Sequence, residues 1–325
     1  MTRRFISQLG EGESVDQVFL TLQKQTRSNR NGNLYLQLRL ADRTGSVTGM
    51  LWNANEKVTE MFECGEYLRV QGTTQIYNGV LQMIVNRIDP VVQADVDPED
   101  FVTVTEKEIE TLTTRLREML RGMKNFPLRN LADCFLMDEE FMRRFCKAPA
   151  GIKNHHAFHG GLLQHVINVM ELAQDISPRY PEMDADLLLI GAFLHDVGKI
   201  EELGYEREFE YTDAGQLLGH LVIAQSMLDE KVAEAEKLSG ETFPRELVLR
   251  IKHMILSHHG LYEYGSPKVP MTLEALALHY LDSLDSKMHT FTQLMAEDAS
   301  GDSGWTNYHP SLGRKIFKGS ANPEG

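Results

Sequence analysis

The spacing of apolar residues changes once along this chain of 325 residues, in an acidic stretch at residues 96–106. Before that stretch, short segments rich in β-branched and aromatic residues mostly alternate between apolar and polar positions, a pattern typical of strands. After it, apolar residues recur at every third or fourth position, a pattern typical of helices. A chain of this length is also too long for one ordinary core. The sequence therefore predicts a multidomain α and β protein, with a β domain followed by an all-α domain.

The β region contains five strand-like segments, separated by turn signals at Asn29–Asn33, Asp42–Gly45 and Asn78–Gly79. Five short strands in so short a region favour a small closed barrel, and the OB-fold is the commonest such barrel that binds oligonucleotides. An SH3-like or other small barrel is the alternative. We expect a five-stranded OB-like barrel in which aromatic rings stack on bases and arginines lie near phosphates. The candidates are Tyr35, Arg39, Arg43, Trp52 and Tyr77; core or rim positions in the barrel are the alternative for each.

The net charge of −14 argues at first sight against a nucleic-acid partner, because phosphate is usually bound by cationic patches. The charge is unevenly distributed, however. Residues 1–95 carry ten of the 33 basic and ten of the 47 acidic side chains, so the remainder carries the whole net charge. All 12 histidines lie from His155 onward. An acidic, histidine-rich second half is what a divalent-cation site would need.

Imidazole and carboxylate side chains recur in apolar helical surroundings of this second half. His195 and Asp196 end the apolar segment DLLLIGAFLHDVGKI, where burying both groups costs several kcal/mol unless something compensates them. A lone buried histidine is more often structural than a ligand, but here the pattern repeats in several separate helices. The other members are His165, His220, His258, His259 and Asp282. Nitrogen and oxygen ligands without cysteine favour an open hydrolytic site for Mn²⁺, Fe²⁺, Mg²⁺ or Zn²⁺, and their number suits two ions.

The sequence His165…His195–Asp196…Asp282 resembles the H…HD…D signature of the HD superfamily of phosphohydrolases, all-helical domains with a metal at the bundle centre. The resemblance implies that Lys199 of HDVGK contacts phosphate. It also implies that His220 and the His258–His259 doublet are the extra ligands of the dinuclear branch, and that Asp282 binds metal. Asp285, one turn later, is the alternative ligand, and otherwise it supports the site or contacts a neighbouring helix. No GYP follows the doublet, which argues against a cyclic-dinucleotide phosphodiesterase.

Longer phrases resemble one family more closely. KNHHAFHGGLLQHV, LLGHLVIAQ, ILSHHGLYEYGSPKVPMTLEALALHYLDSLDSKM and FLTLQKQTRSNRNGNLYLQLRLADRTGSVTGMLW are similar to the YhaM-type 3′→5′ exoribonucleases, which couple an OB domain to an HD domain. The resemblance runs from about residue 12 to 318. It implies four regions: an OB-like nucleic-acid-binding domain at 1–95, an acidic linker with connecting helices at 96–150, an HD phosphohydrolase domain at 151–300, and a polar tail at 301–325.

The implied activity is metal-dependent removal of nucleoside 5′-monophosphates from the 3′ end of single-stranded RNA, with single-stranded DNA as a further substrate. Two divalent ions, with Mn²⁺ the first candidate, would activate a water for in-line attack on the phosphodiester. Asp196 and Lys199 are the expected catalytic residues. His156, in a loop before the first ligand helix, is a third candidate, for contact with phosphate or the leaving oxygen.

Two other functions fit parts of the sequence. The helical domain could hydrolyse free nucleotides or cyclic dinucleotides, or the protein could bind nucleic acid without catalysis. No stretch approaches the ~20 apolar residues of a membrane span, so no membrane partner is expected. Three widely spaced cysteines are typical of reduced residues in a cytoplasmic protein. The number of subunits stays open, a homo-oligomer included.

Overall fold

A computed structural model describes residues 3–28, 33–77, 79–101, 104–151, 158–205, 210–298, 303–310 and 312–319. These residues fall into two compact units. One holds the described residues of Met1–Thr103 and Thr290–Gly325, and the other those of Val104–Tyr205 and Phe209–His289. We call them the barrel unit and the helical unit. Within the described part of the chain, no helix has the length and apolar character needed to cross a membrane.

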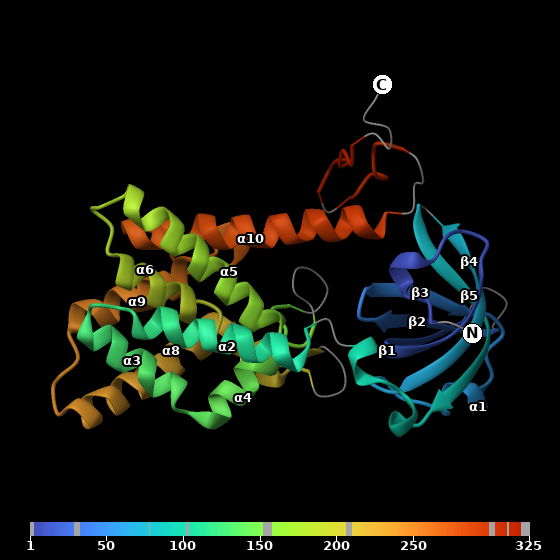
Figure 1. Ribbon diagram of the computed structural model, residues 1–325, viewed down its shortest axis with the longest axis horizontal. Helices are drawn as coiled ribbons and strands as arrows, with labels where there is room; N and C mark the ends of the chain where they lie inside the picture. Colours follow the sequence, from blue (N-terminus) through green and yellow to red (C-terminus); the bar gives the residue numbers. More distant parts are fainter. Residues whose placement is uncertain are drawn as a thin grey trace. The chain divides into compact units, whose positions relative to one another are not determined.

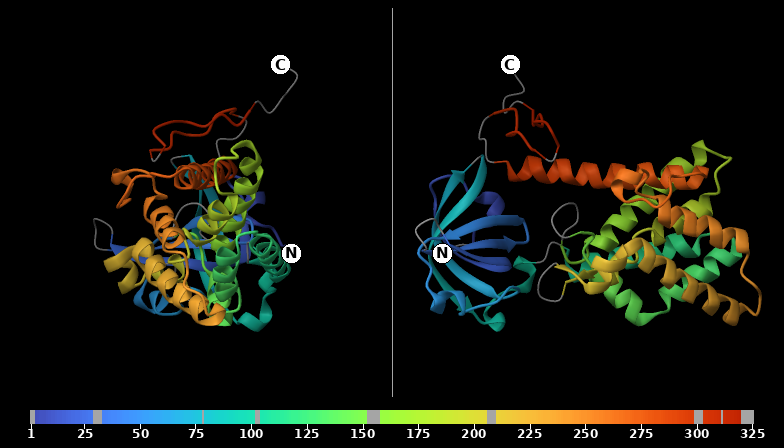
Figure 2. Two further views of the ribbon diagram at one scale, coloured as in Figure 1. Left: turned by 90° about the vertical axis from the view of Figure 1, so that its left-hand side faces the viewer. Right: turned by 180° about the vertical axis from the view of Figure 1, so that it is seen from behind.

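The barrel unit is built on five strands that close on themselves in the order β1-β2-β3-β5-β4 (Figures 1 and 2). They are β1 (Ser14–Ser28), β2 (Leu34–Asp42), β3 (Gly45–Leu51), β4 (Tyr67–Tyr77) and β5 (Val80–Val91), with the short helix α1 (Glu56–Thr59) between β3 and β4. The pairing of β3 with β5 is parallel and every other pairing is antiparallel. Closure leaves no free sheet edge. The predicted five-stranded OB-like barrel is therefore confirmed.

Alternation along β2 separates the barrel core from its outer surface. Leu36, Leu38 and Leu40 are at most 1% exposed and fill the core, while Tyr35, Gln37 and Arg39 point outward, as the two-residue period of a strand requires. Close packing also explains why one position of the barrel is glycine. At the β4–β5 bulge, a Cβ on Gly72 would lie 2.4 Å from the carbonyl oxygen of Ile84, so no larger residue fits there.

The described residues of the C-terminal region pack as part of the barrel unit. Asp298 forms an isolated bridge with Val80, and the Asn307 side-chain amide donates to the Gly79 carbonyl at 3.3 Å. Thr306 and Ile316 are 2% and 5% exposed. The sequence predicts only a polar tail here, because single bridges leave no periodic pattern.

The helical unit confirms the predicted helical domain, to which the structure adds one antiparallel pair of two-residue strands, β6 (Leu203–Gly204) and β7 (Glu210–Tyr211). Its helices are α2 (Glu106–Arg121), α3 (Phe126–Leu136), α4 (Glu139–Lys147), α5 (Gly161–Ile176), α6 (Ala185–Leu194), α7 (Lys199–Glu202), α8 (Asp213–Ser239), α9 (Arg245–Ser257) and α10 (Leu273–Glu297), the last counted in this unit up to His289. Side-chain caps begin several of them. Thr105, for example, accepts from the Glu108 amide while Glu108 accepts from Thr105, a capping box that starts α2.

Helix α6 lies at the centre of this unit. Its residues from Leu187 to Leu194 are all buried, so it is apolar on every side and other helices surround it. Phe193 packs edge-to-face against Phe135, Phe141 and Phe145, with ring centroids 5.7 to 6.3 Å apart. The residues that directly follow α6 are therefore held inside the protein.

Candidate metal centre

His195 and Asp196 follow α6 directly and are 0% and 1% exposed. The Nδ1–H of His195 donates to the Ala192 carbonyl at 2.8 Å, which turns Nε2 inward. The two oxygens of Asp196 face different histidines. Oδ2 lies 3.4 Å from Nε2 of His195 and 3.6 Å from Nε2 of His165, while Oδ1 lies 3.5 Å from Nε2 of His220 and 3.6 Å from Nε2 of His258. One carboxylate thus stands between two groups of imidazoles.

The first group joins α5 to α10. His165 of α5 has its Nε2 atom 3.3 Å from Nε2 of His195 and 3.3 Å from Oδ1 of Asp282. Its Nδ1–H donates to Asp285 at 2.7 Å, and Asn168 donates to the other oxygen of Asp285 at 2.9 Å. Ligand atoms of His165, His195 and Asp282 lie within 4.8 Å of one another. Asp282 therefore faces the cluster, and Asp285 orients the ring of His165 from behind.

The second group comprises His220, His258 and His259, whose ring nitrogens also lie within 4.8 Å of one another. Each Nδ1 has an acceptor behind it. His258 donates to the Ile255 carbonyl at 2.8 Å and His259 to the Tyr264 carbonyl at 3.1 Å. His220 donates to Glu202 at 3.0 Å. Outer acceptors of this kind fix the tautomer and leave Nε2 as the free ligand atom of a metal-binding histidine.

A break inside α8 aims His220 at the cluster. Gly219 has φ 74° and ψ 158°, a conformation that favours glycine, and Glu202 accepts from both the backbone N–H and Nδ1 of His220 at 3.0 Å. The packing is close, because a Cβ on Gly198 would lie 2.1 Å from the His220 carbonyl oxygen. Sequence reasoning missed Glu202. The glycine before His220 in LLGHL was the available signal of a break, but nothing in IEE distinguishes Glu202 from Glu201.

Two buried atoms of this cluster lack a hydrogen bond among the described residues: Oδ1 of Asp196 and Nε2 of His220. Buried polar atoms normally have a partner, so both atoms need something more than the described chain supplies. A divalent cation would supply it. The donors are imidazole nitrogens and carboxylate oxygens without thiolates, a set that suits Mn²⁺, Fe²⁺, Mg²⁺ or Zn²⁺. The residues present therefore fit a bound divalent metal.

Charges around the cluster are mutually compensated. Burial would raise the pKa of Asp196, but the charges of Lys199 and His195 outweigh it and hold that pKa well below its usual range. The Lys199 ammonium lies 2.6 Å from Oδ2 of Asp196. Burial and the neighbouring His195 charge keep the pKa of His258 well below its ordinary value, so its imidazole is neutral and able to bind a cation. Burial also lowers the pKa of His259.

Replacing Glu202 by glutamine should weaken metal binding about 10- to 100-fold, the usual cost of losing a partner behind a ligand. The amide keeps the size of the side chain but removes the charge that holds the backbone and ring of His220. Calorimetric titration of metal-free protein with Mn²⁺ measures the change. Glu201→Gln is the matched control, because Glu201 is exposed and pairs with Arg144 instead. Equal Mn²⁺ affinities for both variants would contradict this role of Glu202.

The remaining predicted site residues lie in different places, and not all of them belong to one surface. His156 lies outside the described residues. Tyr35 and Trp52 lie together, with ring centroids 5.1 Å apart, and Arg39 shares the outward side of β2 with Tyr35. Arg43, by contrast, packs its guanidinium over the Phe5 ring at 4.3 Å. Tyr77 ends β4 and is 60% exposed. Only Tyr35, Trp52 and Arg39 therefore form one candidate surface.

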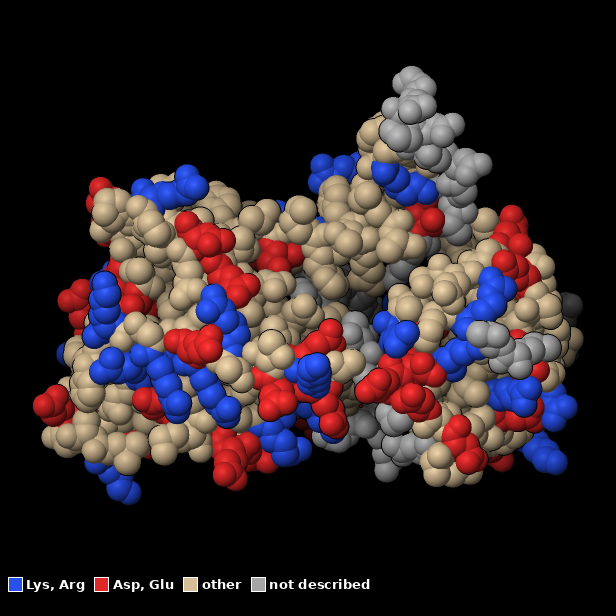
Figure 3. All heavy atoms as spheres, in the orientation of Figure 1, with Lys and Arg blue, Asp and Glu red and all other residues tan. Residues whose placement is uncertain are grey.

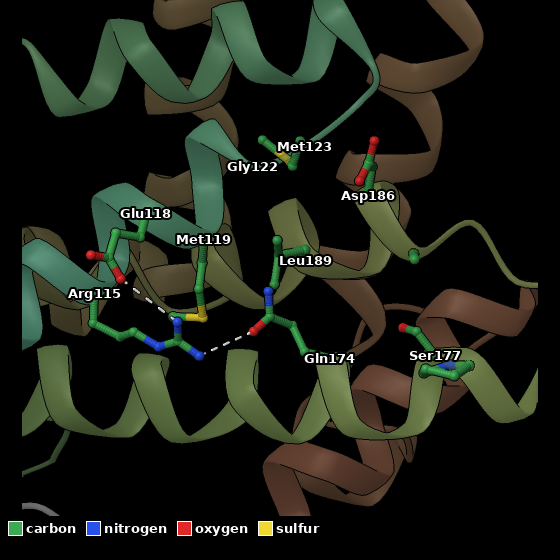
Figure 4. Close-up of a pocket in the computed structure, with 11 residues that line it drawn as sticks. Arg115, Glu118, Met119, Gly122, Met123, Gln174, Ser177, Asp186 and Leu189 are labelled. Atoms are coloured by element: carbon green, nitrogen blue, oxygen red, sulfur yellow. Dashed lines mark hydrogen bonds and ion pairs between the residues drawn. The ribbon is translucent and has the colours of Figure 1, made fainter.

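A separate pocket of about 350 Å³ lies between α2, α5 and α6 (Figure 4). None of the predicted site residues lines it. Arg115 crosses it, and its guanidinium is already engaged by Glu171 at 3.0 Å and Gln174 at 3.4 Å. On the face shown in Figure 3, basic and acidic side chains of the helical unit are interspersed. We assign the chemistry to the buried histidines, whose ligand atoms lie together.

Comparison with known families agrees with this division of the chain. The HD domain family matches residues 162–287, and the OB-fold nucleic acid binding domain family matches residues 21–91. The second OB-fold domain of replication protein A from Methanococcus maripaludis matches 29% of this chain and 98% of its own, at 25% identity and a TM-score of 0.23. The two family matches and the cluster define a protein that joins an OB-fold domain to an HD domain.

Two relatives match over nearly the whole length. The 3′-5′ exoribonuclease YhaM of Bacillus subtilis (strain 168) is 35% identical over 90% of this chain and 90% of its own. The 3′-5′ exoribonuclease YhaM of Geobacillus sp. (strain WCH70) is 34% identical over 90% and 88%. The chain belongs to the YhaM family, and the resemblance seen in the sequence is confirmed.

Proposed function

We propose that this protein is a metal-dependent 3′→5′ exoribonuclease that releases nucleoside 5′-monophosphates from single-stranded RNA. The observation that carries the proposal is the position of Asp196, a buried carboxylate whose two oxygens face separate groups of histidines. A scaffold that only binds RNA has no use for such a cluster. The names of the relatives supply the substrate and the direction.

Two divalent cations, Mn²⁺ first among the candidates, would be held by His165, His195, Asp196, His220, His258, His259 and Asp282. When bound, such cations lower the pKa of water and neutralise charge on phosphate oxygens. Outer hydrogen bonds from Asp285 and Glu202 keep the rings of His165 and His220 in place. Lys199 is the catalytic cation of the chain itself. Its ammonium, 2.6 Å from Asp196, would stabilise charge that develops on a phosphate oxygen.

The barrel unit would hold upstream nucleotides on the surface of Tyr35, Trp52 and Arg39, with stacking as the main attraction. Polar side chains continue this surface across β1, where Gln23, Gln25 and Arg27 stand opposite β2 residues. Arg43 and Tyr77 remain candidates for contacts outside it. Because stacking and phosphate contacts do not require a 2′-hydroxyl, single-stranded DNA is a second substrate to test. The free cysteines suit a cytoplasmic enzyme.

The test uses Mn²⁺-loaded protein and single-stranded RNA labelled at its 5′ end. A ladder that shortens from the 3′ end, with nucleoside 5′-monophosphates as the only small product, is the expected result. Turnover of free nucleotides or cyclic dinucleotides with the RNA left intact would replace the proposal by a nucleotide hydrolase. Retention of RNA without turnover of any of these compounds would replace it by a non-catalytic binding protein.

Metal affinity should rise with pH. Burial would lower the pKa of His165, but its contacts with Asp282 and Asp285 outweigh burial and raise that pKa to about 9 in the metal-free protein. Below pH 9 a cation must therefore displace this proton, which costs about tenfold in affinity per pH unit for each proton released. Calorimetric Mn²⁺ titrations at pH 6 and pH 8 should differ about 100-fold. Repeating them in buffers of different ionisation enthalpy counts the protons, and an affinity independent of pH would contradict the assignment of His165.

A further inference from the structure

A short loop directly after the second histidine group carries exposed aromatic rings. We call it the Gly260–Gly265 loop; it contains the single 3-10 turn Tyr262–Tyr264. Tyr262 is 62% exposed and Tyr264 is 67% exposed, and Leu261 between them and the histidines is 47% exposed. Large rings that reach solvent this close to a hydrolytic centre do not contribute to the core and call for another role.

This loop is fixed by contacts with the centre itself. The Tyr264 carbonyl accepts from Nδ1–H of His259 at 3.1 Å, so the loop orients a proposed metal ligand. Gly260 has φ 81°, and a Cβ there would lie 2.2 Å from the His279 ring, which donates to the His258 carbonyl at 2.7 Å. The backbone of the Gly260–Gly265 loop is thus held in place by His259 on one side and by His279 on the other.

The far end of the loop is fixed as well. Ser266 is 3% exposed, and its hydroxyl lies 3.0 Å from the Leu256 carbonyl and 2.6 Å from the Lys268 carbonyl. Its backbone N–H donates to the Leu261 carbonyl at 3.3 Å. A rigid backbone holds exposed rings at low entropic cost, which is what a preformed stacking surface requires.

We propose that the rings of Tyr262 and Tyr264 stack on the 3′-terminal base of the RNA while its phosphodiester lies at the metal centre. The inference rests on the proposed function. The Tyr264 carbonyl accepts from Nδ1–H of His259, so the loop lies directly behind the ring of a proposed ligand. A nucleotide carries its base several ångströms from its phosphate, so a base can reach rings in the loop beside the centre while its phosphate lies at the centre. Stacking suits an enzyme that must accept any base at the 3′ end, because every base presents a π-face.

The test separates the contribution of the terminal base from the chemistry. Tyr262→Ala and Tyr264→Ala are compared with wild type on three substrates: RNA, the same RNA with an abasic 3′-terminal nucleotide, and bis(p-nitrophenyl) phosphate. Loss of a stacked base should raise KM for RNA about 5- to 150-fold. KM for the abasic RNA, which has no terminal base to stack, should be the same for wild type and both alanine variants. Tyr→Phe at either position keeps the ring and should restore the KM of wild type.

Tyr180→Ala is the matched control, because Tyr180 is an exposed tyrosine of the helical unit beyond the far end of α5 from His165. Equal KM values for wild type and both alanine variants on RNA would overturn the inference while leaving the proposed function standing. Light scattering that shows either alanine variant losing subunits would also overturn it, in favour of an interface between copies. A wild type that hydrolyses bis(p-nitrophenyl) phosphate but not RNA would refute the proposed function and this inference with it.

Discussion

Asp196→Asn should lower kcat for RNA hydrolysis by at least about 10³-fold, because the substitution removes charge from both ligand groups at once and a metal centre supplies several kcal/mol of transition-state stabilisation. Asparagine keeps the shape of the side chain but leaves Lys199 without its carboxylate partner. Metal content, measured by mass spectrometry after dialysis, should fall together with activity. End-labelled RNA measures kcat directly.

Asp175→Asn provides the control, since Asp175 is an exposed aspartate on α5. Thermal unfolding followed by circular dichroism should show that both variants remain folded at the assay temperature. An Asp196→Asn enzyme that retains its metal and cleaves RNA at a rate near that of wild type would remove the basis of the proposed centre.

The double variant Tyr35→Ala/Trp52→Ala should raise KM for long RNA at least about 30-fold, because each stacked base contributes ~1–3 kcal/mol. The two rings lie 5.1 Å apart and Trp52 is 49% exposed, so neither substitution opens a cavity in the barrel core. Fluorescence anisotropy of labelled RNA with the metal-free protein reports the same loss without catalysis.

Bis(p-nitrophenyl) phosphate serves as the control substrate for this variant, since a molecule of that size has no upstream nucleotides to hold. Its turnover should be unchanged. Tyr35→Phe should retain the affinity of wild type. Unchanged RNA binding by the double variant would show that the nucleic-acid surface of the barrel lies elsewhere, with Arg43 and Tyr77 as the next residues to substitute.

The barrel and the helical unit could be predicted because each depends on a periodic pattern. Alternation along Leu36, Leu38 and Leu40 fixes which side of β2 is buried, and no knowledge of the neighbouring strand is needed for that. The order of the strands cannot be predicted in this way, because the parallel pairing of β3 with β5 produces no pattern in the sequence of either strand. Packing of the C-terminal residues in the barrel unit was missed for the same reason, because it depends on single contacts such as that of Asn307 with Gly79.

Candidate ligands could be identified because an imidazole on an apolar helix is costly to bury and therefore conspicuous. Of the residues that support them, Asp285 was expected beside the ligands and lies behind His165, whereas Glu202 was not expected. Glu202 and Glu201 are chemically identical neighbours, and only the fold decides that one faces His220 while the other pairs with Arg144. Arg43 shows what the sequence leaves open, because the guanidinium that is a candidate for phosphate contact also packs over the Phe5 ring.

The break at Gly219 bears on how related sequences should be interpreted. The direction of His220 is decided by a carboxylate from another helix and by a backbone angle that favours glycine, so the histidine alone does not make a ligand. A homologue that keeps every histidine but has changed Gly219 or Glu202 can have lost half of its centre without any gap in the recognisable motif. Those two positions therefore deserve equal weight with the histidines when activity is inferred from a genome.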